Sequence, residues 1–111
     1  MGYTNEVGLA ITATGYSKLL EYNASEVIVD CLESADEHSS NAQTNSRLFI
    51  WHCTKWDRSY SDVEALLVGL AEVDICEYVY VRLGEDSSDE EIMGNWRNND
   101  FQFGFGNFLY Y

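Results

Sequence analysis

The side chains best suited to chemistry in this chain are carboxylates, and they gather in two groups. One group follows an alternating run at residues 78–83 and a break at Gly84, and it comprises Glu85, Asp86, Asp89, Glu90 and Glu91. The other follows a helical pattern at steps of four, three and four residues, and it comprises Glu26, Asp30, Glu33 and Glu37. Such groups can hold a hard cation, face a basic partner, or hydrate a surface. The residue types alone leave these three hypotheses open.

The spacing of the first group argues against a metal site. A calcium-binding EF-hand loop needs ligands at alternate residues, a central glycine and a closing glutamate. Residues 85–91 lack this pattern, and Ser87 and Ser88 stand where carboxylates would be needed. Zinc is disfavoured because His52 and Cys53 are adjacent, and adjacent residues of a strand point to opposite faces. We predict no metal and no cofactor, and a Ca²⁺- or Mg²⁺-binding role stays a distant third hypothesis.

No constellation typical of catalysis is visible in the sequence. A cysteine nucleophile needs a nearby base, and nothing marks one for Cys53. Paired carboxylates for acid–base chemistry require one of the pair in an apolar pocket, whereas residues 85–91 form a strongly polar segment. A glycine-rich phosphate loop is also missing. We predict no catalytic residues, so an enzyme shares the distant third place with a metal-binding protein.

The charge balance restricts the partners. The chain has 19 acidic and six basic residues, which gives a net charge of −13. Direct binding to DNA or RNA needs Lys and Arg on the phosphates, so we exclude it, and the same field repels anionic membranes. It attracts basic proteins, although plain solubility would account for the charge equally well.

The termini and the cysteines predict a cytoplasmic protein. The chain does not start with a secretory signal, and no apolar run approaches the roughly 20 residues that span a bilayer. Cys31, Cys53 and Cys76 are an odd number of thiols, each within an apolar segment. We therefore expect them to be buried and reduced.

The elements that must position these side chains predict a single α+β domain over residues 1–111. Alternation predicts strands at 6–12 and 78–83, a continuous apolar run predicts a central strand at 47–56, and alternating phenylalanines predict a last strand from Phe101 to Phe105. Helical spacing predicts helices at about 15–22, 26–36 and 61–73, while residues 37–46 are expected to form a polar loop. The order β-α-β-α-β-β predicts a four-stranded mixed sheet with its helices on one face.

The strand at 78–83 decides which side chains face a partner. We assign Val79, Val81 and Leu83 to the face beneath the helices, so Tyr78 and Tyr80 would lie on a partly open face beside the acidic residues. Tyrosines at the centre of an interface often dominate its binding energy, so both are predicted partner anchors. Arg82, on the same face, is expected to pair with Glu85 or Asp86.

Residues 54–91 resemble a pattern in small, mostly uncharacterised acidic proteins of tailed bacteriophages. The matching pieces are Lys55-Trp56, a Tyr-Ser-Asp-Val-Glu-Ala segment at 60–65, the helix to Leu70, and an Arg-x-Gly-Glu-Asp-x-x-Asp-x-Glu string at 82–91. Met1-Gly2-Tyr3 with Glu6-Val7 is similar as well. The resemblance implies a phage product that acts in the cytoplasm of a bacterial host. It implies no activity and no catalytic residues.

We therefore expect an inhibitor of the anti-CRISPR or anti-restriction type. It would act as a DNA mimic, with carboxylates where phosphates would lie on the basic surface of a host nuclease or CRISPR effector. The helical group from Glu26 to Glu37 is the better candidate contact, because it lies outside the strongest resemblance. The rival hypothesis is a phage structural or assembly protein, held in a homo-oligomer by the aromatic sheet face.

Overall fold

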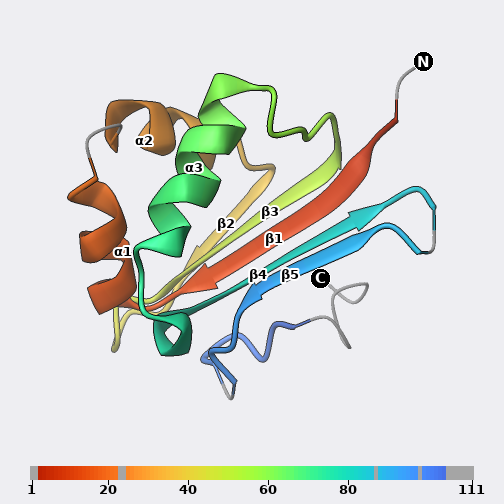
Figure 1. Ribbon diagram of the computed structural model, residues 1–111. Coiled ribbons are helices and arrows are strands. Elements are labelled where there is room, and N and C mark those ends of the chain that lie inside the picture. The colour runs from red at the N-terminus through yellow and green to blue at the C-terminus, as the bar shows by residue number, and fades with distance from the viewer. Residues whose placement is uncertain (1–2, 23–24, 87, 98, 105–111) are drawn as a thin grey trace.

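A five-stranded antiparallel sheet carries three helices on one of its faces (Figure 1). The computed structural model describes residues 3–22, 25–86, 88–97 and 99–104. The strands are β1 (Asn5–Ile11), β2 (Glu37–Ser40), β3 (Arg47–Thr54), β4 (Tyr78–Gly84) and β5 (Glu90–Gly94). The helices are α1 (Ala13–Leu20), α2 (Ser25–Glu33) and α3 (Ser61–Ala71), and a 3₁₀ turn, η1 (Ile75–Glu77), precedes β4. The α+β class is confirmed.

The predicted four-stranded mixed sheet is wrong in its strand count and its pairing. The order across the sheet is β2-β3-β1-β4-β5, and all four neighbouring pairs are antiparallel. The edge strand β2 lies in the expected polar loop, and β5 begins in the acidic segment at residues 85–91 and continues beyond it to Gly94. Both are short edge strands without clear alternation. Residues 101–104 form no strand, and the rest of the predicted last strand lies outside the described residues.

The helix-covered face of the sheet holds the larger core. Side chains from three strands pack there against the helices, and those that carry most of the contact are Val7, Leu9, Ile11, Phe49, Trp51, Tyr78, Tyr80, Leu19, Ile28, Leu66 and Leu70. Burying each large apolar side chain contributes about 1.5–3 kcal/mol. Gly69 of α3 lets the helices approach closely, because a Cβ there would lie 2.7 Å from Leu19 Cδ1 and 3.0 Å from Ile28 Cδ1.

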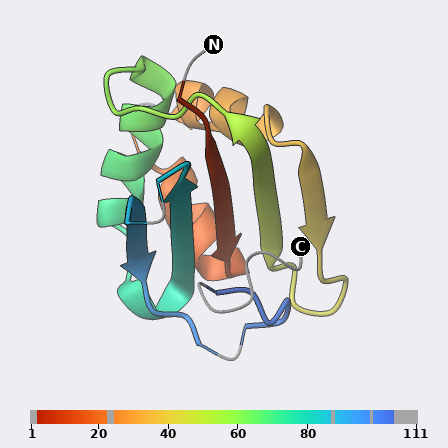
Figure 2. The ribbon, with the colours of Figure 1, turned by 90° about the vertical axis from the view of Figure 1, so that its right-hand side faces the viewer.

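The opposite face of the sheet is covered by the chain that follows β5. Figure 2 shows this segment crossing one end of the sheet on the side away from the helices. Phe103 is 4% exposed and packs against a second apolar cluster that includes Leu48, Ile50, Val79 and Val81. Both faces of β4 are therefore buried.

This double burial reverses the predicted faces of β4. Tyr78 and Tyr80 lie beneath the helices and are 2% and 0% exposed, so the prediction that they anchor a partner is wrong. Val79 and Val81 face the segment after β5 instead. The Tyr80 hydroxyl accepts a 2.8 Å hydrogen bond from Trp56 Nε1, which satisfies the polar end of a buried ring. A tyrosine with a buried partner suits a core as well as a surface, and alternation alone could not distinguish the two.

The end of α2 separates Glu37 from the predicted acidic stripe. The helix ends at Glu33, and the Ser34 hydroxyl donates to the Cys31 carbonyl oxygen at 2.6 Å just beyond it. Serine side chains compete with helical bonding in this way. Glu37 lies on β2, so its predicted place on the helix is wrong.

The cysteines differ from one another in exposure. Cys31 is buried, and burial raises the pKa of its thiol to about 12, so it is chemically inert. Cys53 and Cys76 are exposed, so the prediction that all three are buried is wrong for these two. In the part of the chain that the structure describes, every helix is too short or too polar to cross a bilayer.

Tyr80→Phe tests whether this side chain belongs to the core. The change leaves the Trp56 indole N–H without its acceptor, so the free energy of unfolding should fall by about 1–3 kcal/mol in urea denaturation. Tyr60→Phe is the matched control because that ring is 43% exposed, and it should change stability by less than about 0.5 kcal/mol. Equal stability of the Tyr80→Phe variant and the wild type would contradict the assignment.

Candidate functional site

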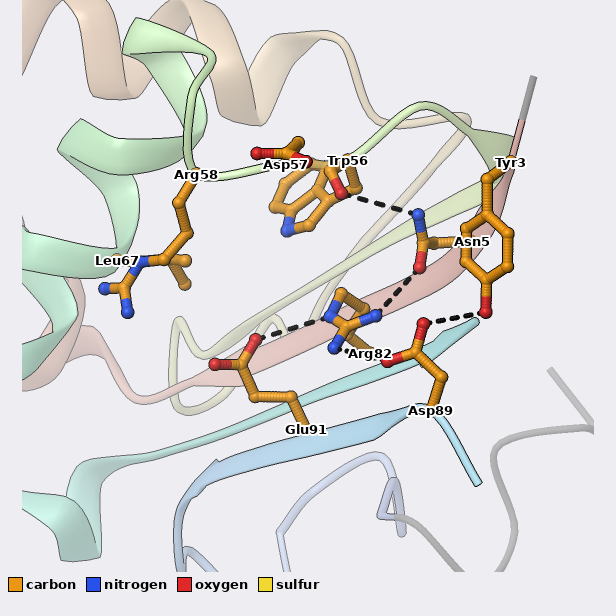
Figure 3. Close-up of a pocket in the computed structure, with 9 residues that line it drawn as sticks. All are labelled: Tyr3, Asn5, Trp56, Asp57, Arg58, Leu67, Arg82, Asp89 and Glu91. Atoms are coloured by element: carbon orange, nitrogen blue, oxygen red, sulfur yellow. Dashed lines mark hydrogen bonds and ion pairs between the residues drawn. The ribbon is translucent and has the colours of Figure 1, made fainter. Parts of the chain in front are cut away.

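A pocket opens where the start of β1, the β4–β5 turn and the segment before α3 meet (Figure 3). Its volume is about 340 Å³. The wall combines aromatic, apolar and charged side chains, which are Tyr3, Asn5, Trp56, Asp57, Arg58, Leu67, Arg82, Asp89 and Glu91. Three of these residues belong to the sequence-predicted acidic group or its strand, so the pocket brings part of that group together.

Arg82 is the central cation of this pocket, and its charge is already compensated. Its side chain is 18% exposed, and its guanidinium donates to Asn5 Oδ1 at 2.9 Å, Asp89 Oδ1 at 3.0 Å and Glu91 Oε1 at 3.4 Å. The hydrogen bond with Asp89 is the main reason that the pKa of Arg82 is raised. Figure 3 shows the three partners around the guanidinium. Arg82 therefore joins β1, β4, β5 and the turn between the last two.

The prediction that Arg82 pairs with Glu85 or Asp86 is wrong. The antiparallel register sets Glu91 directly opposite Arg82, and Asp89 closes the turn beside it. No strand was expected among the five carboxylates at residues 85–91, so this register could not be anticipated. Asn5 completes the site from a distance of 77 residues, with its Nδ2 donating to the Trp56 carbonyl oxygen at 3.4 Å.

Most carboxylates of the β4–β5 turn are engaged in internal hydrogen bonds. Asp86 Oδ1 accepts from the Ser88 amide at 3.0 Å, which lowers the pKa of Asp86. Asp89 holds Arg82 and also accepts from the Tyr3 hydroxyl at 2.7 Å, and both bonds lower the pKa of Asp89. Glu85 accepts from the Thr4 amide.

Gly84 is required for this arrangement of the turn. A Cβ at Gly84 would collide with the Asp89 carboxylate and the Tyr3 hydroxyl. The turn is thus built around its own carboxylates. Of the five carboxylates in the group, that of Glu90 alone makes no hydrogen bond or ion pair with another described residue.

The acidic residues of α2 are free by comparison. Glu26, Asp30 and Glu33 are exposed, and their spacing sets them along one face of the helix. Their carboxylates make no hydrogen bond or ion pair within the described ranges. A shallow hollow of about 370 Å³ lies beside them, lined by Ser25, Glu26, Val29 and Asp30. The structure therefore brings three of the four predicted helical carboxylates together and leaves Glu37 apart.

Glu37 belongs to a second cluster that sequence reasoning missed. Its carboxylate contacts His52 Nε2, while His52 Nδ1 lies 2.8 Å from Glu6 Oε1. The side chain of Asp36 accepts from the His52 backbone amide at 2.6 Å. Glu6, Glu37 and His52 come from three strands and are separated by up to 46 positions, so no spacing pattern marks them. Among the described residues, no group of three or more His, Cys, Asp or Glu side chains is arranged to hold a metal ion.

Arg82→Met tests the structural role of the pocket cation. The variant keeps the apolar stem but leaves Asp89, Glu91 and the side-chain oxygen Oδ1 of Asn5 without their donor, so we expect a loss of about 2–3 kcal/mol in the free energy of unfolding. Arg58→Met is the control, because the Arg58 side chain is 56% exposed and its ion-pair partner among the described residues is Glu64 at the surface. It should cost less than about 1 kcal/mol. Equal losses in the two variants would contradict a special role for Arg82.

We compared the chain with known protein families, curated proteins and solved structures. No family model, no curated protein and no solved structure matches the chain. The resemblance of residues 54–91 to tailed-phage proteins therefore stays a prediction from the sequence, and the physical basis for a function is the charge and geometry described above.

Proposed function

We propose that this chain is a non-catalytic, phage-encoded inhibitor that occupies the basic nucleic-acid-binding surface of a host defence or DNA-processing protein. The contact is made chiefly by the acidic face of α2, which we define as Glu26, Asp30 and Glu33. The supporting observation is the difference between the two acidic groups. The turn carboxylates hold the fold together, whereas those of α2 have no partner in the described part of the chain.

The rigidity of α2 favours an electrostatic contact of this kind. The helix packs against α3, so its carboxylates project from a fixed backbone rather than from a loop. With a rise of about 1.5 Å per residue, Glu26 and Asp30 are about 6 Å apart along the axis. Ordered negative charge of this density speeds association with a Lys- and Arg-lined channel at low salt.

Apolar surface beside the charges supplies a second component. Val27 is 39% exposed, and Val29 lines the hollow between Glu26 and Asp30. Lysine and arginine side chains lay their aliphatic stems on apolar surface and keep the charged head among acceptors. The α2 face therefore matches the chemistry of a basic protein surface better than that of a metal ion.

Charge reversal on α2 tests the proposal. The protein is immobilised, exposed to bacterial lysate and to purified nucleases at about 50 mM and about 200 mM salt, and then washed with duplex DNA. The wild type should retain a nucleic-acid-binding protein that both the higher salt and the DNA release. Glu26→Lys/Asp30→Lys should abolish retention, since it inverts the α2 face.

The matched control is Glu21→Lys/Glu72→Lys, which changes the net charge by the same amount at two other exposed sites. It should retain the partner almost as well as the wild type, and circular dichroism should show that all three proteins are folded. If nothing is retained at low salt, or if both double variants lose the partner equally, a specific α2 contact is ruled out.

An assembly protein stays the second candidate, because β5 is an open sheet edge with Ile92 50% exposed. Unpaired strand edges are templates for pairing with another chain. The inhibitor proposal predicts a monomer in light scattering at micromolar concentration. A large oligomer that Ile92→Asp dissociates would favour assembly instead.

A further inference from the structure

The pairing of β1 with β3 contains an irregularity at His52 and Cys53. Val7 pairs with Trp51 and Asn5 pairs with Thr54, so β3 has one residue more than β1 between these pairs. Such a bulge re-aims side chains, and Cys53 has a φ of +48°, which is uncommon for a residue other than glycine. Glu6 lies opposite and accepts from the Cys53 amide at 2.6 Å.

The bulge sets the His52 ring between two carboxylates on different strands. Nδ1 lies 2.8 Å from Glu6 Oε1 of β1, and Nε2 contacts Glu37 Oε2 of β2. Because β3 lies between β1 and β2, the His52 ring contacts carboxylates from the neighbouring strands on both sides of β3. A neutral imidazole has a single N–H and can donate to only one of the carboxylates. Only the imidazolium satisfies both contacts.

We propose that His52 is a pH-sensitive clamp that fastens the edge strand β2 to β1 when its ring is charged and releases the start of β2 when the ring is neutral. All four residues of β2 are exposed, and the strand is held by its ladder with β3, by the His38 ring against Phe49 and by this clamp. The Asp36 carboxylate lies just before β2 and accepts a hydrogen bond from the His52 backbone amide, so it also ties the start of β2 to β3.

The groups that face the ring favour its charged form. Glu37 faces it from β2 and Glu6 from β1, and hydrogen bonds with these two raise the pKa of His52, Glu37 contributing most. Asp36 and Glu85 add negative charge around the neighbouring Cys53, whose own pKa is raised, chiefly by Glu6.

The pKa of Glu6 moves in the opposite sense. Burial acts to raise it, but the hydrogen bonds from His52 and Cys53 outweigh burial and lower the pKa overall. The clamp is therefore complete at mildly acidic pH, between the titrations of Glu6 and His52.

The sign of the pH dependence follows from the raised pKa of His52. The stabilisation is fully present below the unfolded value of about 6.5 and is lost as the pH rises through the higher folded value. At the acidic end, the contribution of Glu6 disappears as the pH falls through its lowered pKa. The clamp requires no partner, so its test is independent of the proposed inhibition.

Hydrogen exchange on the isolated protein tests the clamp. Protection factors of the His38–Ser40 amides, corrected for intrinsic exchange, are measured at about pH 5.5 and about pH 8.5, on either side of the histidine range. The wild type should lose protection severalfold at the higher pH. His52→Arg keeps a permanent charge and should stay protected at both pH values, whereas His52→Gln should be weakly protected at both.

Two further variants keep the test decisive if a His52 variant folds poorly. Glu37→Gln changes an exposed side chain and should remove most of the pH dependence, while His38→Gln, on the other face of β2, should retain it. The ring titration of His52, followed by NMR in the folded protein and in urea, should show the higher pKa in the folded state. An equal or lower folded pKa, or pH-dependent protection that persists in His52→Gln, would overturn the proposal.

Discussion

The guanidinium of Arg82 is a positive charge that lies between the strands at the end of the sheet where β1 begins. It holds Asn5 on β1, Glu91 on β5 and Asp89 in the turn, and Asp89 in turn holds Tyr3. The β4–β5 hairpin and the start of β1, 77 residues away in the sequence, thus converge on one side chain with little exposure. The pocket, the shape of the turn and the entry of the chain into β1 all depend on this cation. In a chain with six basic residues, its position decides which carboxylates are neutralised.

The positions of the other basic residues explain which carboxylates have no positive charge beside them. Lys18 and Arg58 form surface ion pairs with Glu21 and Glu64, and the guanidinium of Arg47 lies 4.4 Å from the centre of the Tyr16 ring. Within the described ranges, none of these cations pairs with the carboxylates of α2. Self-repulsion among like charges costs stability, so charge that the fold does not neutralise is a candidate for use outside the fold. The net charge of the chain could not reveal that the carboxylates of the turn are paired and those of α2 are not.

The sequence predicted those features that depend on local periodicity. The strands around Leu9 and Tyr80 and the helical spacing of Glu26, Asp30 and Glu33 were identifiable because each pattern repeats within a few residues, and the strand around Ile50 was identifiable from its continuous apolar run. The edge strands β2 and β5 were missed, since short exposed strands need no alternation. The faces of β4 were reversed because both are buried. The partners of Arg82 and His52 depend on strand register and on a bulge, which no spacing in the chain encodes.

The central position of β1 also constrains the order in which the chain can fold. β1 is made first, yet both of its hydrogen-bonded neighbours, β3 and β4, lie far along the sequence, and Leu9 pairs with Phe49 and with Tyr80. Large loops must close before the middle of the sheet exists, which slows folding relative to folds built from local contacts. During synthesis, Val7, Leu9 and Ile11 stay without one strand neighbour until β4 has left the ribosome. The most buried strand of the finished molecule is thus the one left incomplete for longest in the growing chain.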